Sequence, residues 1–147
     1  MQRSITALVV ALAAGGVANA QGAAPYTPSE NPFQGDYAIT LGRPVALHVE
    51  VVGIRLDSLT LRTPAEIKAG EPVRCDVVVA GHNAGERKAE LTIVLLLEDR
   101  DVKALERVAL EPFKVKSGKD FSESQQVDVG ADALAAASRV YVFVQVD

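Results

Sequence analysis

The sequence predicts an all-β protein, an antiparallel β-sandwich of about seven strands. Two observations lead to this prediction. Apolar residues recur at every second position along several runs, which is the period of a strand with one buried face. Turn-forming residues separate these runs at the spacing that is typical of sandwiches. Trp is absent and aromatic residues make up only 5% of the chain, so we expect a core of Val, Leu and Ala.

The clearest alternation lies in residues 73–97, which we interpret as two strands joined by a turn. The inward positions are Val73, Cys75, Val77 and Val79 in the first strand and Leu91, Ile93, Leu95 and Leu97 in the second. Gly81, Asn83 and Gly85 are residue types that tolerate a positive φ, so we place the turn there. Two such strands need a second sheet to cover their aliphatic faces. Cys75 is the only cysteine and is expected to be a small buried hydrophobe.

Residues 1–20 have the pattern of a secretory signal peptide. Arg3 precedes an apolar run over 5–17, and Ala18-Asn19-Ala20 provides an A-x-A cleavage site. The run is too short for an ordinary membrane span, although an uncleaved anchor is the alternative. We therefore expect a periplasmic or extracellular bacterial protein, with no membrane span after the leader is cleaved.

Residues 21–44 are expected to be a flexible N-terminal extension, and residues 45–147 the β-sandwich domain. The extension is rich in Pro, Gly and small polar residues, and it has no periodicity. Residues 45–52 then alternate as a half-buried strand until Gly53, which predicts a bulge or bend. The apolar parity changes within residues 54–62, which predicts a second bulge or a strand that crosses between sheets.

The rest of the chain continues with short elements. Residues 98–101 are a polar hairpin tip, and residues 102–110 fit either a strand or a short helix, with the neighbouring strands favouring the former. Residues 121–129 alternate as another strand, and residues 131–138 are a turn of helix or a tight loop. Residues 140–146 are apolar on both faces, as in a central strand.

From about Leu56 to its end, the chain resembles the immunoglobulin-like and fibronectin type III-like domains of bacterial surface proteins, in particular the cell-adhesion-related domains. The resemblance lies in the blocks AGEPVRCDVVVAGHNAGERKAELTIVLLL, VKSGKDFSESQQVDV and RVYVFVQV. It implies an immunoglobulin-like fold. The chain differs from antibody domains because it has no core Trp and no partner for Cys75, and from the fibronectin order because it stops after the penultimate strand.

The missing closing strand has two solutions. The N-terminal strand Val45–Val52 folds back and fills the gap in the same molecule, or an N-terminal segment fills the gap in a neighbouring molecule and builds a fibre by strand addition. Pro25, Pro28 and Pro32 remove ladder donors from the extension, which favours closure within one molecule.

No set of reactive side chains points to catalysis. His48 and His82 are the only histidines and lie in different segments, whereas a zinc site needs about three or four ligands. Glu98, Asp99 and Asp101 could offer oxygens to calcium, but the run lacks the pattern of a calcium loop and is expected to be a solvated tip. The sequence contains neither a triad framework nor a phosphate-binding loop, so we expect neither enzymatic activity nor a cofactor.

The predicted function is that of a secreted, non-enzymatic structural or binding component of the cell envelope or extracellular surface. The net charge of −4 argues against nucleic acid. A protein partner or self-association is expected; the alternatives are a self-assembling fibre subunit and an accessory domain that binds carbohydrate or protein. The candidate contact residues are Asn83, Gly85, Arg87, Glu98, Asp99 and Asp101.

Val94 and Leu96 lie opposite the predicted buried face of residues 91–97. They are contact candidates only if that outer face is open. The sequence favours the other interpretation, in which both faces are buried and the strand is central.

Overall fold

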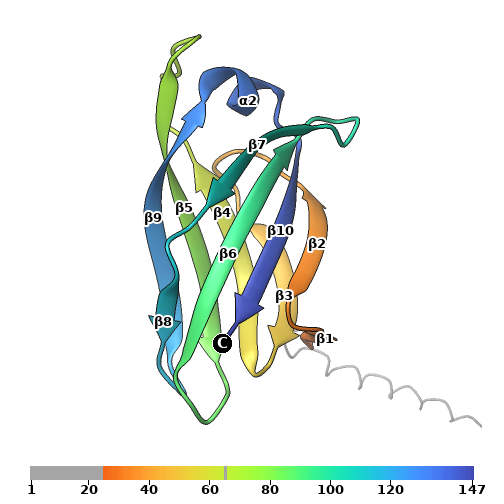
Figure 1. Ribbon diagram of the computed structural model, residues 1–147, viewed down its shortest axis with the longest axis vertical. Coiled ribbons are helices and arrows are strands. Elements are labelled where there is room, and N and C mark those ends of the chain that lie inside the picture. Colours follow the sequence, from red (N-terminus) through yellow and green to blue (C-terminus); the bar gives the residue numbers. More distant parts are fainter. Residues whose placement is uncertain (1–24, 65) are drawn as a thin grey trace, which may run out of the picture.

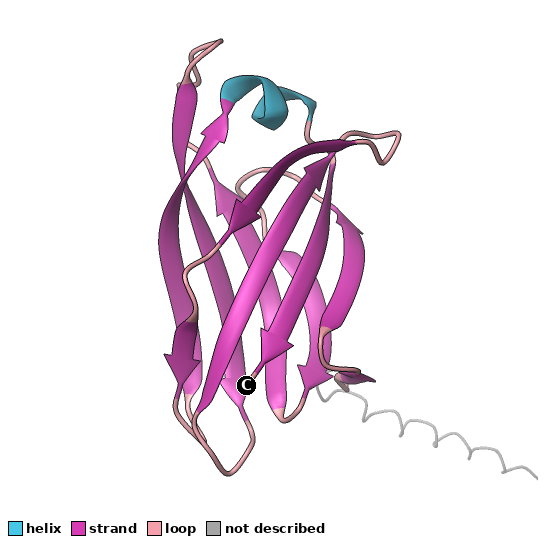
Figure 2. Ribbon diagram, viewed as in Figure 1, coloured by secondary structure: helices cyan, strands magenta, loops and turns pink. Residues whose placement is uncertain are grey.

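The chain folds into two β-sheets that pack face to face, as the computed structural model of residues 25–64 and 66–147 shows (Figure 1). The elements are β1 (Thr27–Ser29), β2 (Phe33–Ala38), β3 (Val45–Val51), β4 (Ile54–Arg62), β5 (Pro72–Asn83), β6 (Ala89–Glu98), β7 (Ala104–Ala109), β8 (Phe113–Val115), β9 (Asp120–Gly130), α2 (Ala131–Ala136) and β10 (Arg139–Val146). Strands dominate the described part of the chain (Figure 2), so the all-β prediction is confirmed.

Sheet I has the strand order β1-β3-β4-β5-β9, and sheet II has the order β2-β10-β6-β7, with β8 also paired to β6. The β1–β3 pair is parallel, whereas the other pairs in the two sheets are antiparallel. The described residues therefore contain ten strands, more than the sequence predicted. The predicted signal peptide and cleavage site lie outside the described residues.

The core lies between the sheets and consists mainly of Val, Leu and Ile side chains. The inward residues of β6 and β10 are all buried: Leu91, Ile93, Leu95, Leu97, Val140, Val142, Val144 and Val146. Each such side chain contributes about 1.5–3 kcal/mol by leaving water. Cys75 is buried among them, and this burial raises the pKa of its thiol, which makes it a packing residue as the sequence predicted.

The change of parity in residues 54–62 is a bulge. Leu56 pairs with Gly81 and Ser58 pairs with Ala80, so Asp57 is an extra residue in β4. The bulge lets residues on both sides of it point inward, since Leu56 and Leu59 are both buried.

Gly53 belongs to a hairpin turn rather than to the predicted bulge or bend. Val51 pairs with Ile54, and the two residues between them have positive φ values, 47° at Val52 and 81° at Gly53. Positive φ at both central positions defines the turn whose twist matches a two-residue β-hairpin. Residues 45–62 therefore form the β3–β4 hairpin of sheet I.

The predicted extension includes a strand of sheet II, which corrects two expectations. Residues 33–38 form β2, which pairs antiparallel with β10, whereas Val45–Val51 form β3 in sheet I. The gap beside β10 is therefore closed within the molecule, but by β2. Its inward side chains, Phe33 and Tyr37, flank Gly35, and this short, glycine-interrupted alternation gave too weak a pattern to be recognised.

A side chain prolongs the pairing of β2 with β10. The Asn31 amide Nδ2 donates to the Val146 carbonyl at 2.7 Å, and the Val146 backbone N–H donates to Asn31 Oδ1 at 3.0 Å. The amide thus takes the place of one further backbone residue in the ladder, although Pro32, which lies between Asn31 and β2, has no N–H to donate.

The C-terminal elements follow the sequence prediction. Residues 104–109 form a strand, residues 131–136 form a short helix, and β10 is central, between β2 and β6. Over the described ranges, no helix combines the length and the hydropathy needed to cross a bilayer.

Candidate interaction surface

The six predicted contact residues do not form one surface. Asn83, Gly85 and Arg87 lie around the β5–β6 turn, and Glu98, Asp99 and Asp101 lie around the β6–β7 turn. These turns are at opposite ends of β6 (Figure 1). Two of the six are also inaccessible, because Asn83 is 1% exposed and Glu98 is 6% exposed. Of the others, Arg87 and Asp101 are exposed.

Asn83 organises the loops at its end of the sandwich. Its Nδ2 donates to the carbonyls of Arg87 at 2.9 Å and Val115 at 3.1 Å, and its Oδ1 accepts from the Gly85 N–H at 2.9 Å. Asn83 itself is part of β5, so the predicted turn begins after it. The residue type that suggested a turn is present here because a buried amide can satisfy three backbone groups.

Asp99 has a similar role at the opposite end. Its Oδ1 accepts from the N–H groups of Asp101 at 2.8 Å and Lys103 at 3.0 Å. The carboxylate therefore shapes the β6–β7 turn. Residues 25–64 and 66–147 contain no group of three or more His, Cys, Asp or Glu side chains arranged to hold a metal ion.

Glu98 lies beside this turn and holds its proton more tightly in the folded state. Burial raises the pKa of the Glu98 carboxyl, and a hydrogen bond with Asp36 and the charge of that carboxylate raise it further. The Asp99 charge also raises this pKa, whereas Arg139 lowers it. Glu98 Oε1 has no hydrogen-bond partner among the described residues.

This environment predicts a pH dependence that Glu98→Gln should remove. Because the folded-state pKa is raised, the proton stabilises the fold below the ordinary carboxyl range, and this stabilisation is lost as the pH rises through the raised pKa. Urea unfolding at a series of pH values should show the free energy of unfolding of the wild type falling relative to the variant as the pH rises. Parallel curves for the two proteins would contradict this prediction.

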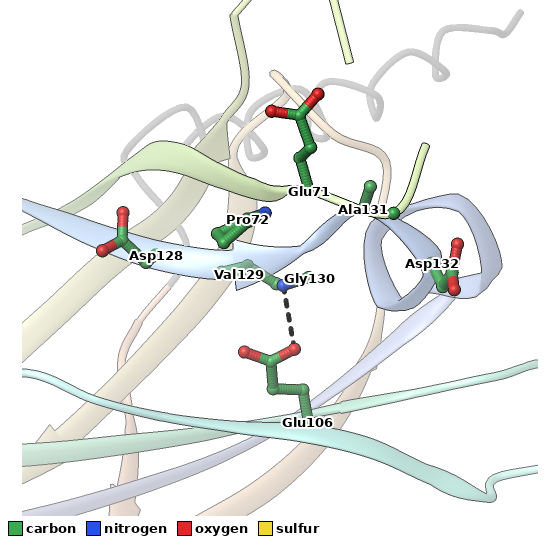
Figure 3. Close-up of a pocket in the computed structure, with 9 residues that line it drawn as sticks. Glu71, Pro72, Glu106, Asp128, Val129, Gly130, Ala131 and Asp132 are labelled. Atoms are coloured by element: carbon green, nitrogen blue, oxygen red, sulfur yellow. Dashed lines mark hydrogen bonds between the residues drawn. The ribbon is translucent and has the colours of Figure 1, made fainter. Parts of the chain in front are cut away.

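An acidic hollow lies near α2, but its side chains do not converge. Glu106 Oε1 accepts from the Gly130 N–H at 3.0 Å. The carboxylates of Glu71, Asp128 and Asp132 point in different directions (Figure 3). The hollow therefore offers no common point at which these oxygens could bind a ligand together.

The outer face of sheet I is a charged, solvated surface. Glu50, Arg55, His82 and Asp120 follow one another in a row across β3, β4, β5 and β9. Arg55 Nε lies 2.9 Å from Glu50 Oε1, and His82 Nδ1 lies 2.7 Å from Asp120 Oδ1. These pairs satisfy each other at the surface, where each contributes little to stability.

Each histidine contacts a different side chain: His82 pairs with Asp120, and His48 lies against Tyr26. The ring of Tyr26 stacks on His48 with the ring centroids 5.4 Å apart, and Arg55 lies 5.4 Å from the centroid of the Tyr26 ring. The Tyr26 hydroxyl donates to Asp57. These contacts attach the start of the described chain to sheet I.

The outer face of sheet II is different, because apolar side chains occupy its centre. Phe143 is opposite Val94, and Tyr141 is opposite Leu96. With Arg107, these residues line a surface hollow. All four apolar side chains are partly exposed, so the interpretation that both faces of this part of β6 are buried is wrong. No element of the described chain covers this face. The outer side chains that the sequence predicted to be covered are therefore partly exposed to solvent.

Polar groups surround this apolar centre. On the β2 side, Arg139 Nε lies 3.0 Å from Asp36 Oδ1, and the Tyr141 hydroxyl donates to Gln34. On the β7 side, Arg107 is exposed and makes no ion pair within the described residues. An apolar centre with a polar rim is the composition of a contact surface. We refer to Val94, Leu96, Arg107, Tyr141 and Phe143 as the sheet II patch.

Comparison with known proteins adds little to this description. No family model matches the chain, and no curated protein matches it. One solved structure with some similarity is the enzymatically active domain of tailspike protein 4 from bacteriophage CBA120, with 7% sequence identity and a TM-score of 0.25. The similarity covers 80% of this chain but only 17% of the tailspike chain, and at this TM-score it carries no argument about fold or activity.

Proposed function

We propose that this chain is a secreted, non-enzymatic, immunoglobulin-like domain that acts as a structural or binding component of the bacterial cell envelope or extracellular surface. The observation that carries the proposal is the sheet II patch, an open apolar face on a sandwich whose other face is charged and solvated. The interior is packed with aliphatic side chains, Asp99 is used in a turn, and His82 is paired with Asp120.

The strand order supports the immunoglobulin-like part of the proposal. In such domains, the second and fifth strands are neighbours in one sheet, and the third and sixth strands are neighbours in the other. We take β4 as the first strand and count β7 and β8 together as the fourth, because both pair with β6. β9 is then the fifth strand and pairs with β5, and β10 is the sixth and pairs with β6. β2 then lies where the closing strand of the family would lie, although it comes from the opposite end of the domain.

Export can be tested separately from binding. The full chain is expressed in a bacterial host, and the periplasm, medium and cytoplasm are analysed by mass spectrometry. We expect a processed protein that begins at Gln21 in the periplasm or the medium. An unprocessed chain that stays in the cytoplasm would contradict the proposed location.

The contact role predicts that a charge within the sheet II patch abolishes binding. Leu96→Arg places a guanidinium in the apolar centre, where its desolvation is costly. We expect at least a tenfold loss of protein that sediments with isolated cell envelopes. Val78→Arg is the matched control, because Val78 is also a partly exposed residue on an outer face, that of sheet I. Equal sedimentation of both variants and the wild type would contradict the role of the patch.

Assembly into a fibre by strand addition is a second candidate function, because β2 pairs only with β10 among the described strands and lies at a sheet edge. Ala38 and Arg139 are directly opposite each other in this pair, so Ala38→Cys combined with Arg139→Cys reports which molecule supplies β2.

We expect the oxidised double variant to form a disulfide within one chain at all protein concentrations. A ladder of linked chains on a non-reducing gel would instead favour strand exchange. The wild type, in which Cys75 is buried, controls for links through that thiol.

A further inference from the structure

We propose that the sheet II patch binds the same patch of a second copy of this chain, around a two-fold axis that runs parallel to the strands between β6 and β10. This inference rests on the proposed function, which assigns the patch as the contact surface, and it names the partner. The two outer faces stack as two aligned sheets do in a sandwich.

The first argument is the order of side chains across sheet II. The register of the four strands places Asp36, Tyr141, Leu96 and Arg107 in one row across the outer face. The row reads acidic, aromatic, aliphatic, basic. The proposed axis exchanges β2 with β7 and β10 with β6. The row of one copy therefore faces the same row of the second copy in the opposite order.

The consequence is complementarity at every position of the row. Asp36 faces the partner's Arg107, and Tyr141 faces the partner's Leu96. The neighbouring row is Gln34, Phe143, Val94 and Ala109, and here Phe143 faces the partner's Val94. A two-fold interface requires a self-complementary surface, and these rows provide one.

The second argument is the state of the charges at the two ends of the row. Arg107 has no ion-pair partner within the described residues, so it is available to a second molecule. Asp36 already accepts from Arg139, but its side chain is 29% exposed, and a carboxylate can accept from more than one donor. The two-fold arrangement joins these groups twice, once on each side of the apolar centre.

The third argument is area. Four strands spaced about 4.8 Å apart give a face about 19 Å wide, and the eight residues of β10 span about 26 Å. The face therefore covers roughly 500 Å² per copy, or about 1,000 Å² for the pair, which is near the lower limit of specific interfaces. We therefore expect a reversible dimer in the micromolar range.

The test is sedimentation velocity of residues 21–147, which include both sheets, from about 1 µM to about 500 µM, because mass action makes dimer formation concentration-dependent. We expect a shift from monomer to dimer across this range. Leu96→Arg should weaken the dimer at least tenfold, and Val78→Arg should leave it unchanged. A monomer at all concentrations, or a dimer that Leu96→Arg does not weaken, would overturn the proposal.

A charge exchange tests the axis itself. Arg107→Glu alone and Asp36→Arg alone each create two like-charge contacts in the homodimer and should weaken it. In an equimolar mixture of the two variants, the heterodimer has one native contact and one contact with the charges reversed. It should therefore recover wild-type affinity. Circular dichroism checks that both variants are folded. Folded variants that do not recover affinity when mixed would overturn this arrangement.

The outcomes also separate this inference from the proposed function. A monomer whose envelope binding is still lost in Leu96→Arg overturns the dimer and keeps the contact role, with carbohydrate or another protein as the occupant. If Leu96→Arg changes neither self-association nor envelope binding, both proposals fail.

Discussion

Gly81→Ala should destabilise the fold by about 3 kcal/mol or more, which lowers the melting temperature by roughly 12 °C. A Cβ atom at this position would lie 2.2 Å from the Arg55 carbonyl oxygen and 2.8 Å from Cζ of Phe121. The first contact is with backbone at the β4 bulge, so a change of rotamer cannot relieve it. Circular dichroism during thermal and urea unfolding measures the effect, since the chain has no Trp to report by fluorescence.

Two controls separate this cause from a general sensitivity of β5. Ala80→Val enlarges the adjacent side chain, which faces outward, and should change the free energy of unfolding by less than about 0.5 kcal/mol. Adding Phe121→Ala to Gly81→Ala removes the ring but leaves the Arg55 carbonyl in place, so little stability should return. Full recovery in that double variant would show that the backbone collision is not the cause.

Asn83→Ala should also cost about 3 kcal/mol. The substitution leaves the Gly85 N–H and the carbonyls of Arg87 and Val115 without their partner. Asn83 is 1% exposed and Val115 is 3% exposed, so water cannot easily replace the amide. The loss should appear in urea unfolding as a lower midpoint with an unchanged dependence on denaturant.

The matched control removes a hydrogen bond of the same loops at the surface. Ser117 Oγ donates to the Gly85 carbonyl at 2.6 Å and is exposed, so Ser117→Ala should cost less than about 1 kcal/mol. Asn83→Asp keeps the acceptor for Gly85 but turns an oxygen toward two carbonyls, so it should be at least as harmful as Asn83→Ala. An aspartate variant of near wild-type stability would contradict the role assigned to the amide donors.

The candidate surface was only partly predictable. The sequence identified Val94 and Leu96 as apolar outer positions, but the same pattern fits a strand covered on both faces. Which case holds depends on whether another element packs there, and that is a property of the assembled sandwich. The sequence predicts contacts at Asn83 and Glu98 because polar residues near turns are usually accessible, whereas the fold buries both.

The inward positions of β5 and β6 follow from the sequence alone, because alternation with a period of two is a local property of each strand. In β10 the two faces alternate in the same way, but both are apolar, so the sequence does not distinguish the inward face. The change of parity in β4 indicates either an extra residue or a strand that crosses between sheets, and the register with β5 shows that it is an extra residue.

Three other features depend on how the strands pack together. β2 closes sheet II beside β10, Gly81 is required by contact rather than by a positive φ, and Arg107 and Asp36 lie at the two ends of one row. These relations join residues far apart in the chain. Their physical basis is packing between strands, and the pattern of residues within one strand does not specify it.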